Sequence, residues 1–215
     1  MDNSYISVYD YTFRQLTAFV ASDAPTPGGG SISALAGALG IALAAMVGNI
    51  TVGKNQDKDL IPEIESLTGN AYYIINKLEK LAEADIAAFG QFIETSRMSK
   101  NTEEEKEKRL QSMQQALKSA TEIPLAMART LLSALEITGH LATLGSKTVL
   151  SDAGAAAYLC EGALNAALLN VDINLPLIKD TEFLQKNLVE KEQLLKEGVR
   201  LKEKALSTVR ERMGS

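Results

Sequence analysis

The chain has 215 residues, of which 46% are hydrophobic and 23% are charged, and its formal net charge is −5. These values are typical of a globular protein that can bury a core without disulfides, and the acidic balance disfavours nucleic acid as a partner. A single cysteine, Cys160, excludes an internal disulfide and a cysteine-based zinc site within one chain.

The first segment, MDNSYISVYDYTF, has neither the basic start nor the apolar run of a secretory signal peptide. Together with the lack of disulfides, this leads us to expect a cytoplasmic protein. A first helix is predicted over residues 8–22, where Phe13, Leu16 and Val20 are spaced by three and four.

The next stretch, APTPGGGSISALAGALG, begins at Ala24 and opens a segment without charged residues that extends to Gly53. Two prolines stiffen the approach to Gly28, Gly29 and Gly30, which we expect to adopt backbone angles closed to other residues and to let a ligand come close. The helix that follows leaves the N–H groups of its first turn unpaired, and these can bind an anion or a carbonyl group. A tight turn with a serine cap between two packed helices is the alternative interpretation.

The helix predicted after this turn, from Gly30 or Ser31 to Lys54, is long enough to cross a bilayer. It is rich in small residues, contains Asn49, and lacks an aromatic belt and a flanking basic cluster. These features favour a buried central helix that packs closely against its neighbours, so we expect no membrane partner.

Helical patterns continue through the middle of the chain. A long helix is predicted over residues 57–98, and Thr102 followed by three glutamates predicts the start of the next one. We expect Pro124 to kink or break that helix and Gly139 to end it.

The last third of the chain predicts two more helices. One begins at Ser151 and Asp152 and runs to about Asn170, and the other is amphipathic and begins at Thr181 after a short break. No segment shows the two-residue alternation of a strand, and no linker or repeat divides the chain. The expected fold is therefore all-α: a single domain over residues 1–215, built as an up-and-down bundle of long helices around the small-residue helix.

Five motifs then carry a family resemblance. Residues 25–54, PTPGGGSISALAGALGIALAAMVGNITVGK, resemble the signature helix of the formiminotetrahydrofolate cyclodeaminase family, which includes methenyltetrahydrofolate cyclohydrolases. The resemblance continues in the same order through AEADIAAF at 82–89, ATEIPLAMA at 120–128, SDAGAAA at 151–157 and NVDINL at 170–175.

Two positions depart from the usual family pattern: Ser146, where Asn is usual, and Asp172, where a basic residue is common. The resemblance implies a helical homodimer that acts on a tetrahydrofolate derivative, with or without a polyglutamate tail, and needs no further cofactor. No cluster of His, Cys and carboxylates has metal-ligand spacing, so no metal is expected.

The implied activity is that of a cyclodeaminase, which converts 5-formiminotetrahydrofolate to 5,10-methenyltetrahydrofolate and ammonia. A methenyltetrahydrofolate cyclohydrolase is the alternative. An alternative of another class is a non-catalytic helical dimer that binds folate or serves as a scaffold.

Asp85 and Asp152 are the candidate catalytic residues. Asp85 lies among alanines, where a carboxylate is unusual unless it faces a cleft, and burial there should raise its pKa. A buried structural hydrogen bond is the alternative. Asp152, at a helix start, is by itself a capping residue, and the resemblance implies a role in the site. The candidate substrate-binding residues are Pro27, Gly28, Gly29, Gly30, Ser31, Lys54, Ser151, Asn170 and Asn174.

The positions of these candidates constrain the site. Asn170 and Asn174 are expected in a loop after a helix, where their amides suit the donors and acceptors of a pterin ring. A straight helix from Ser31 to Lys54 measures about 35 Å, so the glycine-rich turn and Lys54 of one chain cannot hold the same end of one ligand. Either that helix bends at one of its glycines or the two elements come from different subunits, and we favour a site across a dimer interface.

Overall fold

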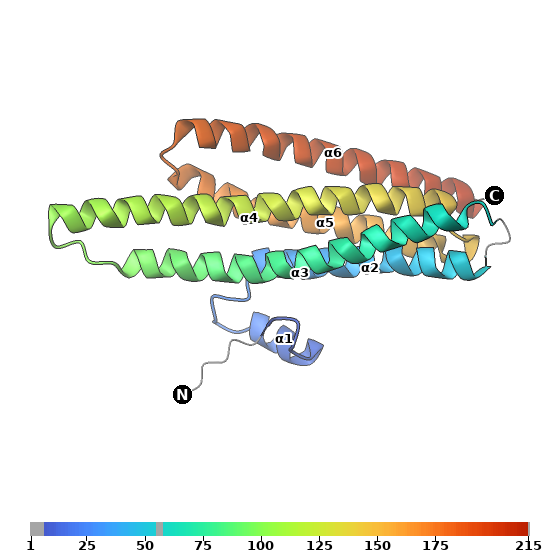
Figure 1. The fold of residues 1–215 in the computed structure, drawn as a ribbon, viewed down its shortest axis with the longest axis horizontal. Helices are drawn as coiled ribbons and strands as arrows, with labels where there is room; N and C mark the ends of the chain where they lie inside the picture. Colours follow the sequence, from blue (N-terminus) through green and yellow to red (C-terminus); the bar gives the residue numbers. More distant parts are fainter. Residues whose placement is uncertain (1–6, 55–57, 215) are drawn as a thin grey trace.

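The computed structural model describes residues 7–54 and 58–214, and helices make up most of this part of the chain (Figure 1). No β-strand occurs within these ranges, which confirms the all-α prediction. The helices are α1 (Phe13–Val20), α2 (Gly29–Lys54), α3 (Ile61–Arg97), α4 (Glu103–Leu144), α5 (Leu150–Asn174) and α6 (Thr181–Gly214). Short 3₁₀ turns, Lys147–Val149 and Leu175–Leu177, precede and follow α5.

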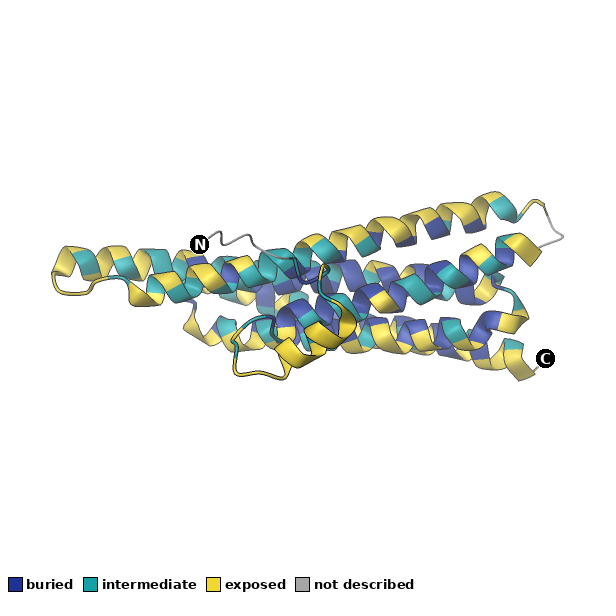
Figure 2. Ribbon diagram, turned by 90° about the horizontal axis from the view of Figure 1, so that it is seen from below, coloured by how far each residue is buried: buried dark blue, intermediate teal, exposed yellow. Residues whose placement is uncertain are grey.

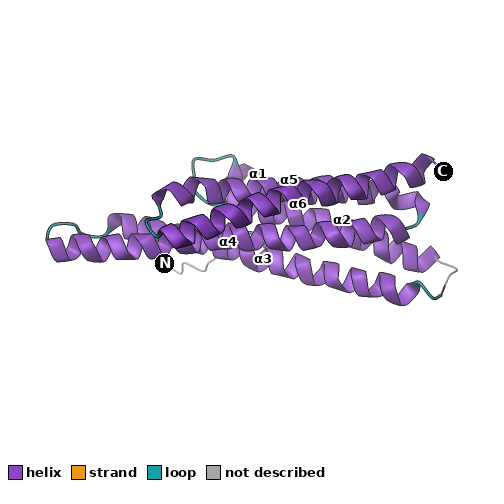
Figure 3. Ribbon diagram, turned by 90° about the horizontal axis from the view of Figure 1, so that it is seen from above, coloured by secondary structure: helices purple, strands orange, loops and turns teal. Residues whose placement is uncertain are grey.

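The long helices α2 to α6 form an up-and-down bundle in which each packs against its neighbours along the chain (Figures 1 and 3). In addition, α2 packs against α5, and α4 packs against α6. The hairpin formed by α3 and α4 extends beyond the other helices, and α1 lies to one side of the bundle, with Leu16 packed against its core. The beginning of α2 and the end of α5 therefore meet near the base of this hairpin.

The small residues of α2 allow the close packing that the sequence predicts. A Cβ atom at Gly37 would lie only 2.2 Å from Leu131 Cδ2, and one at Gly48 would lie 2.1 Å from Thr68 Oγ1. Neither position can take a larger side chain without displacing the neighbouring helix or side chain. Gly37 and Gly48 thus allow the close packing of α2 against α4 and α3.

One side of α2 stays open, in contrast to the expected helix buried all round. Leu39 is 60% exposed, because α3, α4 and α5 cover only the other sides of the helix. By length and composition α2 could cross a membrane, but 61% of its most apolar 18-residue window is buried inside the bundle, as in a core helix. Figure 2 shows this pattern of buried and exposed positions, and it also shows that α1 is largely exposed.

The helix α4 passes through both residues that were expected to interrupt it. Thr102 and Glu105 form a capping box at its start, as the sequence predicts. The helix does not break at Pro124, and the expected end at Gly139 is wrong, because α4 continues to Leu144. Buried side chains line the helix on both sides of these residues, so tertiary packing outweighs the local preferences.

The end of α5 also differs from the prediction. The helix continues past Asn170 to Asn174, because Val171 and Leu175 are buried and extend its apolar face. Asn170 and Asn174 therefore lie on the last turns of a helix and not in a loop. The predicted start of the long helix at residue 57 lies outside the described residues, and within them α3 begins at Ile61.

Candidate active site

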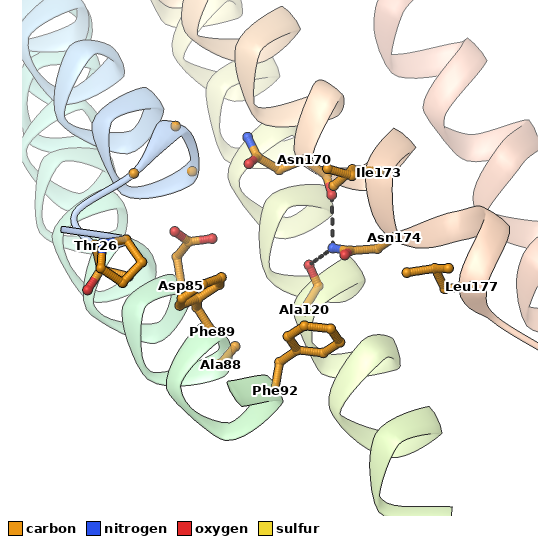
Figure 4. Close-up of a pocket in the computed structure, with 14 residues that line it drawn as sticks. Thr26, Asp85, Ala88, Phe89, Phe92, Ala120, Asn170, Ile173, Asn174 and Leu177 are labelled. Atoms are coloured by element: carbon orange, nitrogen blue, oxygen red, sulfur yellow. Dashed lines mark hydrogen bonds between the residues drawn. The ribbon is translucent and has the colours of Figure 1, made fainter. Parts of the chain in front are cut away.

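A pocket of about 330 Å³ lies where the glycine-rich turn meets α3, α4 and the end of α5 (Figure 4). This volume is within the range of small-molecule sites. The pocket is lined by Pro25, Thr26, Gly28, Gly29, Gly30, Asp85, Ala88, Phe89, Phe92, Ala120, Asn170, Ile173, Asn174 and Leu177. Among these residues the only titratable side chain is that of Asp85.

The first turn of α2 presents backbone N–H groups to this pocket. The Ile32 N–H donates to Gly28 O at 3.0 Å, so the helical bonds begin there and the N–H groups of Gly29, Gly30 and Ser31 have no partner within the helix. The hydroxyl of Ser31 donates to Gly28 O at 3.2 Å and does not cap these groups. The positive end of the helix dipole therefore faces the pocket.

The glycines serve close approach and not unusual backbone angles. No glycine in the described part of the chain has a positive φ, so the expectation that the turn needs such angles is wrong. A Cβ atom at Gly30 would instead lie 2.3 Å from Asp85 Oδ1 and 2.4 Å from Asp85 Oδ2. Only glycine at position 30 lets α2 begin directly against this carboxylate.

The environment of Asp85 changes its acidity. Burial raises the pKa of its carboxyl group above 3.8, and the backbone N–H of Ser31, which bonds to the carboxylate, offsets part of that rise. The apolar surroundings include Ala88 and Phe89 on the same helix. The burial, the pocket lining and the raised pKa agree with the apolar setting predicted for Asp85, and a raised pKa is typical of carboxyl groups that act as general acids and bases.

Two asparagines from α5 face the start of α2 across the pocket. Both Asn170 amide atoms lie 3.7 Å from the position of a Cβ atom at Gly29. The Nδ2 group of Asn170 donates to Ala166 O at 3.0 Å. That of Asn174 donates to Ala120 O and to Asn170 O, both at 2.9 Å. Asn174 uses both N–H groups of its amide on backbone carbonyls and Asn170 uses one, so each side chain has its carbonyl oxygen left for a ligand and Asn170 also keeps one N–H.

Three candidates lie at the opposite end of the bundle. Lys54 ends α2, and its Nζ atom donates to Thr148 Oγ1 at 3.0 Å, beside the start of α5. Ser151 and Asp152 are in the first turn of α5, about 27 Å along that helix from Asn170. Because α2 is one uninterrupted helix, a single chain does not bring these residues to the pocket.

The remaining candidates lie near the glycine-rich turn or at the far end of the bundle, and none of them lines the pocket. Pro27 and Ser31 are buried and lie behind the pocket lining. The expected capping role of Asp152 is not seen, because the N-cap of α5 is Val149 and no side chain caps it.

Both departures from the family pattern lie outside the pocket. Asp172 forms an ion pair with Lys191 on α6, on the side of α5 away from the asparagines. Ser146 lies at the far end of the bundle, where its N–H donates to Thr51 Oγ1 at 2.8 Å. Neither substitution changes a residue that lines the pocket.

Several lining residues were not among the candidates. Phe89 and Phe92 follow Asp85 by four and seven residues, so helical periodicity places them on the same face of α3. Ile173 is likewise one turn from Asn170. Ala120 carries no chemical signal in the sequence, because it contributes its backbone carbonyl.

Comparisons with known proteins agree with this fold. The family model described as Formiminotransferase-cyclodeaminase matches residues 12–193. A methenyltetrahydrofolate cyclohydrolase of Methylorubrum extorquens is 35% identical over 194 residues, which cover 90% of this chain and 93% of that protein. A formimidoyltransferase-cyclodeaminase of Mus musculus is 34% identical over 192 residues, and the matched part is 36% of that longer protein.

A solved structure gives the same result. The crystal structure of formiminotetrahydrofolate cyclodeaminase from Thermotoga maritima superimposes with a TM-score of 0.85 and 30% identity, covering 94% of this chain and 98% of that one. The fold and the pocket thus define an all-helical bundle with one acidic group held at a helix N-terminus. The chain belongs to the formiminotransferase-cyclodeaminase family.

Proposed function

We propose that the protein is a formiminotetrahydrofolate cyclodeaminase, which converts 5-formiminotetrahydrofolate to 5,10-methenyltetrahydrofolate and ammonia. The observation that carries this proposal is Asp85, a carboxyl group of raised pKa in a largely apolar pocket beside the first turn of α2. The relatives named as cyclodeaminases and as a cyclohydrolase support it.

One carboxyl group is sufficient for the proton transfers of this reaction. N10 of the folate attacks the carbon of the protonated formimino group on N5, whose nitrogen becomes an amino group, and N10 loses its proton, which Asp85 can accept. The tetrahedral carbon between N5 and N10 then expels its amino group, and Asp85 can return the proton so that ammonia leaves. The product is the methenyl cation, and the carboxylate that is restored beside it stabilises the positive charge.

The other lining residues suit a tetrahydropterin. Phe89 and Phe92 provide apolar walls, and Asn170 and Asn174 provide amide oxygens for ring N–H groups. The substrate is itself the source of the one-carbon unit, so this chemistry needs no cofactor beyond the folate.

A cyclohydrolase is the second candidate. It is favoured by the Methylorubrum extorquens relative, which matches this chain over almost its whole length. In that reaction water adds to the methenyl carbon and gives a proton to the same carboxyl group. The carboxyl group would then give this proton to N5 as the C–N5 bond breaks, and the hydroxyl proton is released as 10-formyltetrahydrofolate forms.

A spectroscopic assay separates the candidates, because methenyltetrahydrofolate absorbs in the near ultraviolet. A cyclodeaminase produces this absorbance from 5-formiminotetrahydrofolate, whereas a cyclohydrolase removes it faster than spontaneous hydrolysis does. No change in either assay would contradict both activities and leave a folate-binding or scaffold protein.

We further propose that the protein is a homodimer. Exposed apolar residues form a strip on α2 and the outer side of α5, and this strip, the α2–α5 strip, contains no charged side chain. Its members are Leu39, Ala155, Tyr158, Leu159, Gly162, Leu169 and Ile173. A continuous apolar surface of this kind is typical of a subunit interface, and a second copy is the occupant that we infer.

The dimer gives a direct prediction. Leu169, which is 67% exposed, should be buried in the interface, so Leu169→Glu is expected to give a folded monomer by light scattering at micromolar concentration. The matched control is Val189→Glu on α6, where an exposed valine lies outside the strip and the dimer should persist. A parent protein that is monomeric at this concentration would contradict the proposal.

The interface would also account for the candidates at the far end of the bundle. Ile173 belongs both to the α2–α5 strip and to the pocket lining, so the pocket opens beside the proposed interface. We infer that Lys54 and Asp152 reach the site from the second subunit, where Lys54 can contact the glutamate tail. A mixture of Asp85→Asn and Asp152→Asn proteins, each slower than the wild type, should then regain part of the activity after subunit exchange, whereas sites contained in one chain would show no recovery.

A further inference from the structure

Pro124 leaves a gap in the hydrogen bonding of α4 next to the pocket. In an α-helix the N–H of residue 124 would donate to the carbonyl of residue 120, but proline has no N–H. Pro124 is buried, so the Ala120 carbonyl cannot rely on open solvent at that side of the helix. A buried carbonyl without a donor is costly, and a donor must come from elsewhere.

Asn174 supplies that donor from α5. Its Nδ2 group lies 2.9 Å from Ala120 O and 2.9 Å from Asn170 O, and dashed lines in Figure 4 mark both bonds. Both neighbours of this atom are carbonyl oxygens, so only the NH₂ end of the amide can occupy the position. The Oδ1 atom accepts no hydrogen bond from the part of the chain that the structure describes, and Asn174 lines the pocket.

We propose that Pro124 is a positioning residue that fixes the Asn174 carboxamide with Oδ1 as an acceptor for an N–H or NH₂ group of the ligand. Asn174 is then a specificity-determining residue. The identification of that ligand group as the 2-amino-4-oxo edge of a pterin rests on the proposed function. The orientation of the amide itself rests only on its hydrogen bonds to Ala120 O and Asn170 O.

The neighbouring asparagine has the same polarity. The Asn170 Nδ2 group is also used on a carbonyl, that of Ala166, so α5 presents two amide oxygens one helical turn apart. The opposite wall presents the backbone N–H groups of Gly29 and Gly30. The pocket therefore has amide oxygens on the α5 side, and on the α2 side the Asp85 carboxylate lies beside the N–H groups of the first turn, which suits a flat ring with N–H groups along one edge.

Binding of two small ring compounds tests the inference without turnover. Pterin carries a 2-amino donor, whereas lumazine carries an oxygen acceptor at that position. The wild-type protein should bind pterin more tightly than lumazine by about 10-fold or more, because the wrong group leaves Asn174 Oδ1 facing another acceptor. Asn174→Ala should reduce the ratio of the two Kd values to near one.

Pro124→Ala separates positioning from structure. The alanine N–H can bond Ala120 O within α4, so the Asn174 amide is no longer needed there and its orientation is held only by the bond to Asn170 O. We expect the Tm to stay the same or rise, while the ratio of Kd values falls by about 3- to 10-fold, the size of one neutral hydrogen bond. If this variant does not fold, Asn174→Ser provides the same comparison of Kd values.

Asn165→Ala is the matched control, because Asn165 is another α5 asparagine whose amide donates to Glu161 and lies outside the pocket. It should leave the ratio unchanged. An unchanged ratio in both Pro124→Ala and Asn174→Ala would overturn the inference, as would a wild-type protein that binds neither ring or prefers lumazine. Discrimination between the rings without turnover of either folate would retain the inference and reject the proposed function.

Discussion

Replacing Asp85 with asparagine is expected to slow turnover by about 10²–10⁴-fold while the protein still folds and binds the folate. Asparagine keeps the shape of the side chain and can still accept the Ser31 N–H bond, but it cannot exchange a proton. Steady-state kinetics on the wild-type protein and the variant, with the folate Kd measured separately, give the comparison. The limb of the pH–rate profile that reports Asp85 should be absent from the residual activity of the variant.

The stability of this variant gives a second, independent result. Because burial raises the pKa of Asp85, the folded state binds the proton more tightly than the unfolded state does. The contribution of this group to stability is therefore fully present below the unfolded pKa of about 4 and is lost as the pH rises through the folded pKa. Asp85→Asn should consequently match or exceed the wild-type Tm at pH 7–8, and any gain should shrink as the solution is acidified.

The structural alternative predicts the opposite pair of results. If Asp85 only caps α2, its replacement should leave kcat unchanged and lower the Tm at neutral pH. In that case the acid–base role would pass to Asp152, which would have to come from a second subunit.

Gly30→Ala should lower kcat by about 10²-fold with little change in Tm. The new methyl group would lie 2.3 Å from Asp85 Oδ1, so the carboxylate must move away from its position at the start of α2. A displacement of about 1 Å in a catalytic group can cost this much in rate. The helix itself favours alanine over glycine, so folding should not suffer.

Gly29→Ala is the matched control for this change. A Cβ atom at Gly29 would lie 3.7 Å from the Asn170 amide, which is an ordinary contact, so kcat should stay within a few-fold of the wild-type value. Equal rates for the two variants would show that the close approach of Gly30 to Asp85 has no catalytic importance.

Part of the pocket lining could be predicted from the sequence. The isolated carboxylate among alanines pointed to Asp85, and the glycine-rich turn pointed to the start of α2, because both signals are local. Asn170 and Asn174 were also identified, but in the wrong local structure, since the burial of Val171 extends α5 beyond them.

The rest depends on packing between helices that are distant in sequence. The pocket takes residues from the Gly30 end of α2 and not from the Lys54 end. This depends on which end of α5 packs beside each end of α2. The expected break at Pro124 failed for the same reason, because the missing hydrogen bond is replaced by a side chain 50 residues away along the chain. The sequence pattern of α4 itself cannot predict a hydrogen-bond donor that comes from another helix.

Asn174 supplies the hydrogen bond that Pro124 removes from α4, so the two residues are expected to arise by mutation in a definite order. A chain that acquired the proline first would bury a bare carbonyl of Ala120 and be selected against. A chain that acquired the asparagine first would lose nothing, since its amide can still bond to the carbonyl of Asn170. We therefore expect that the asparagine arose before the proline. Among descendants, loss of the asparagine alone should be rarer than loss of the proline alone.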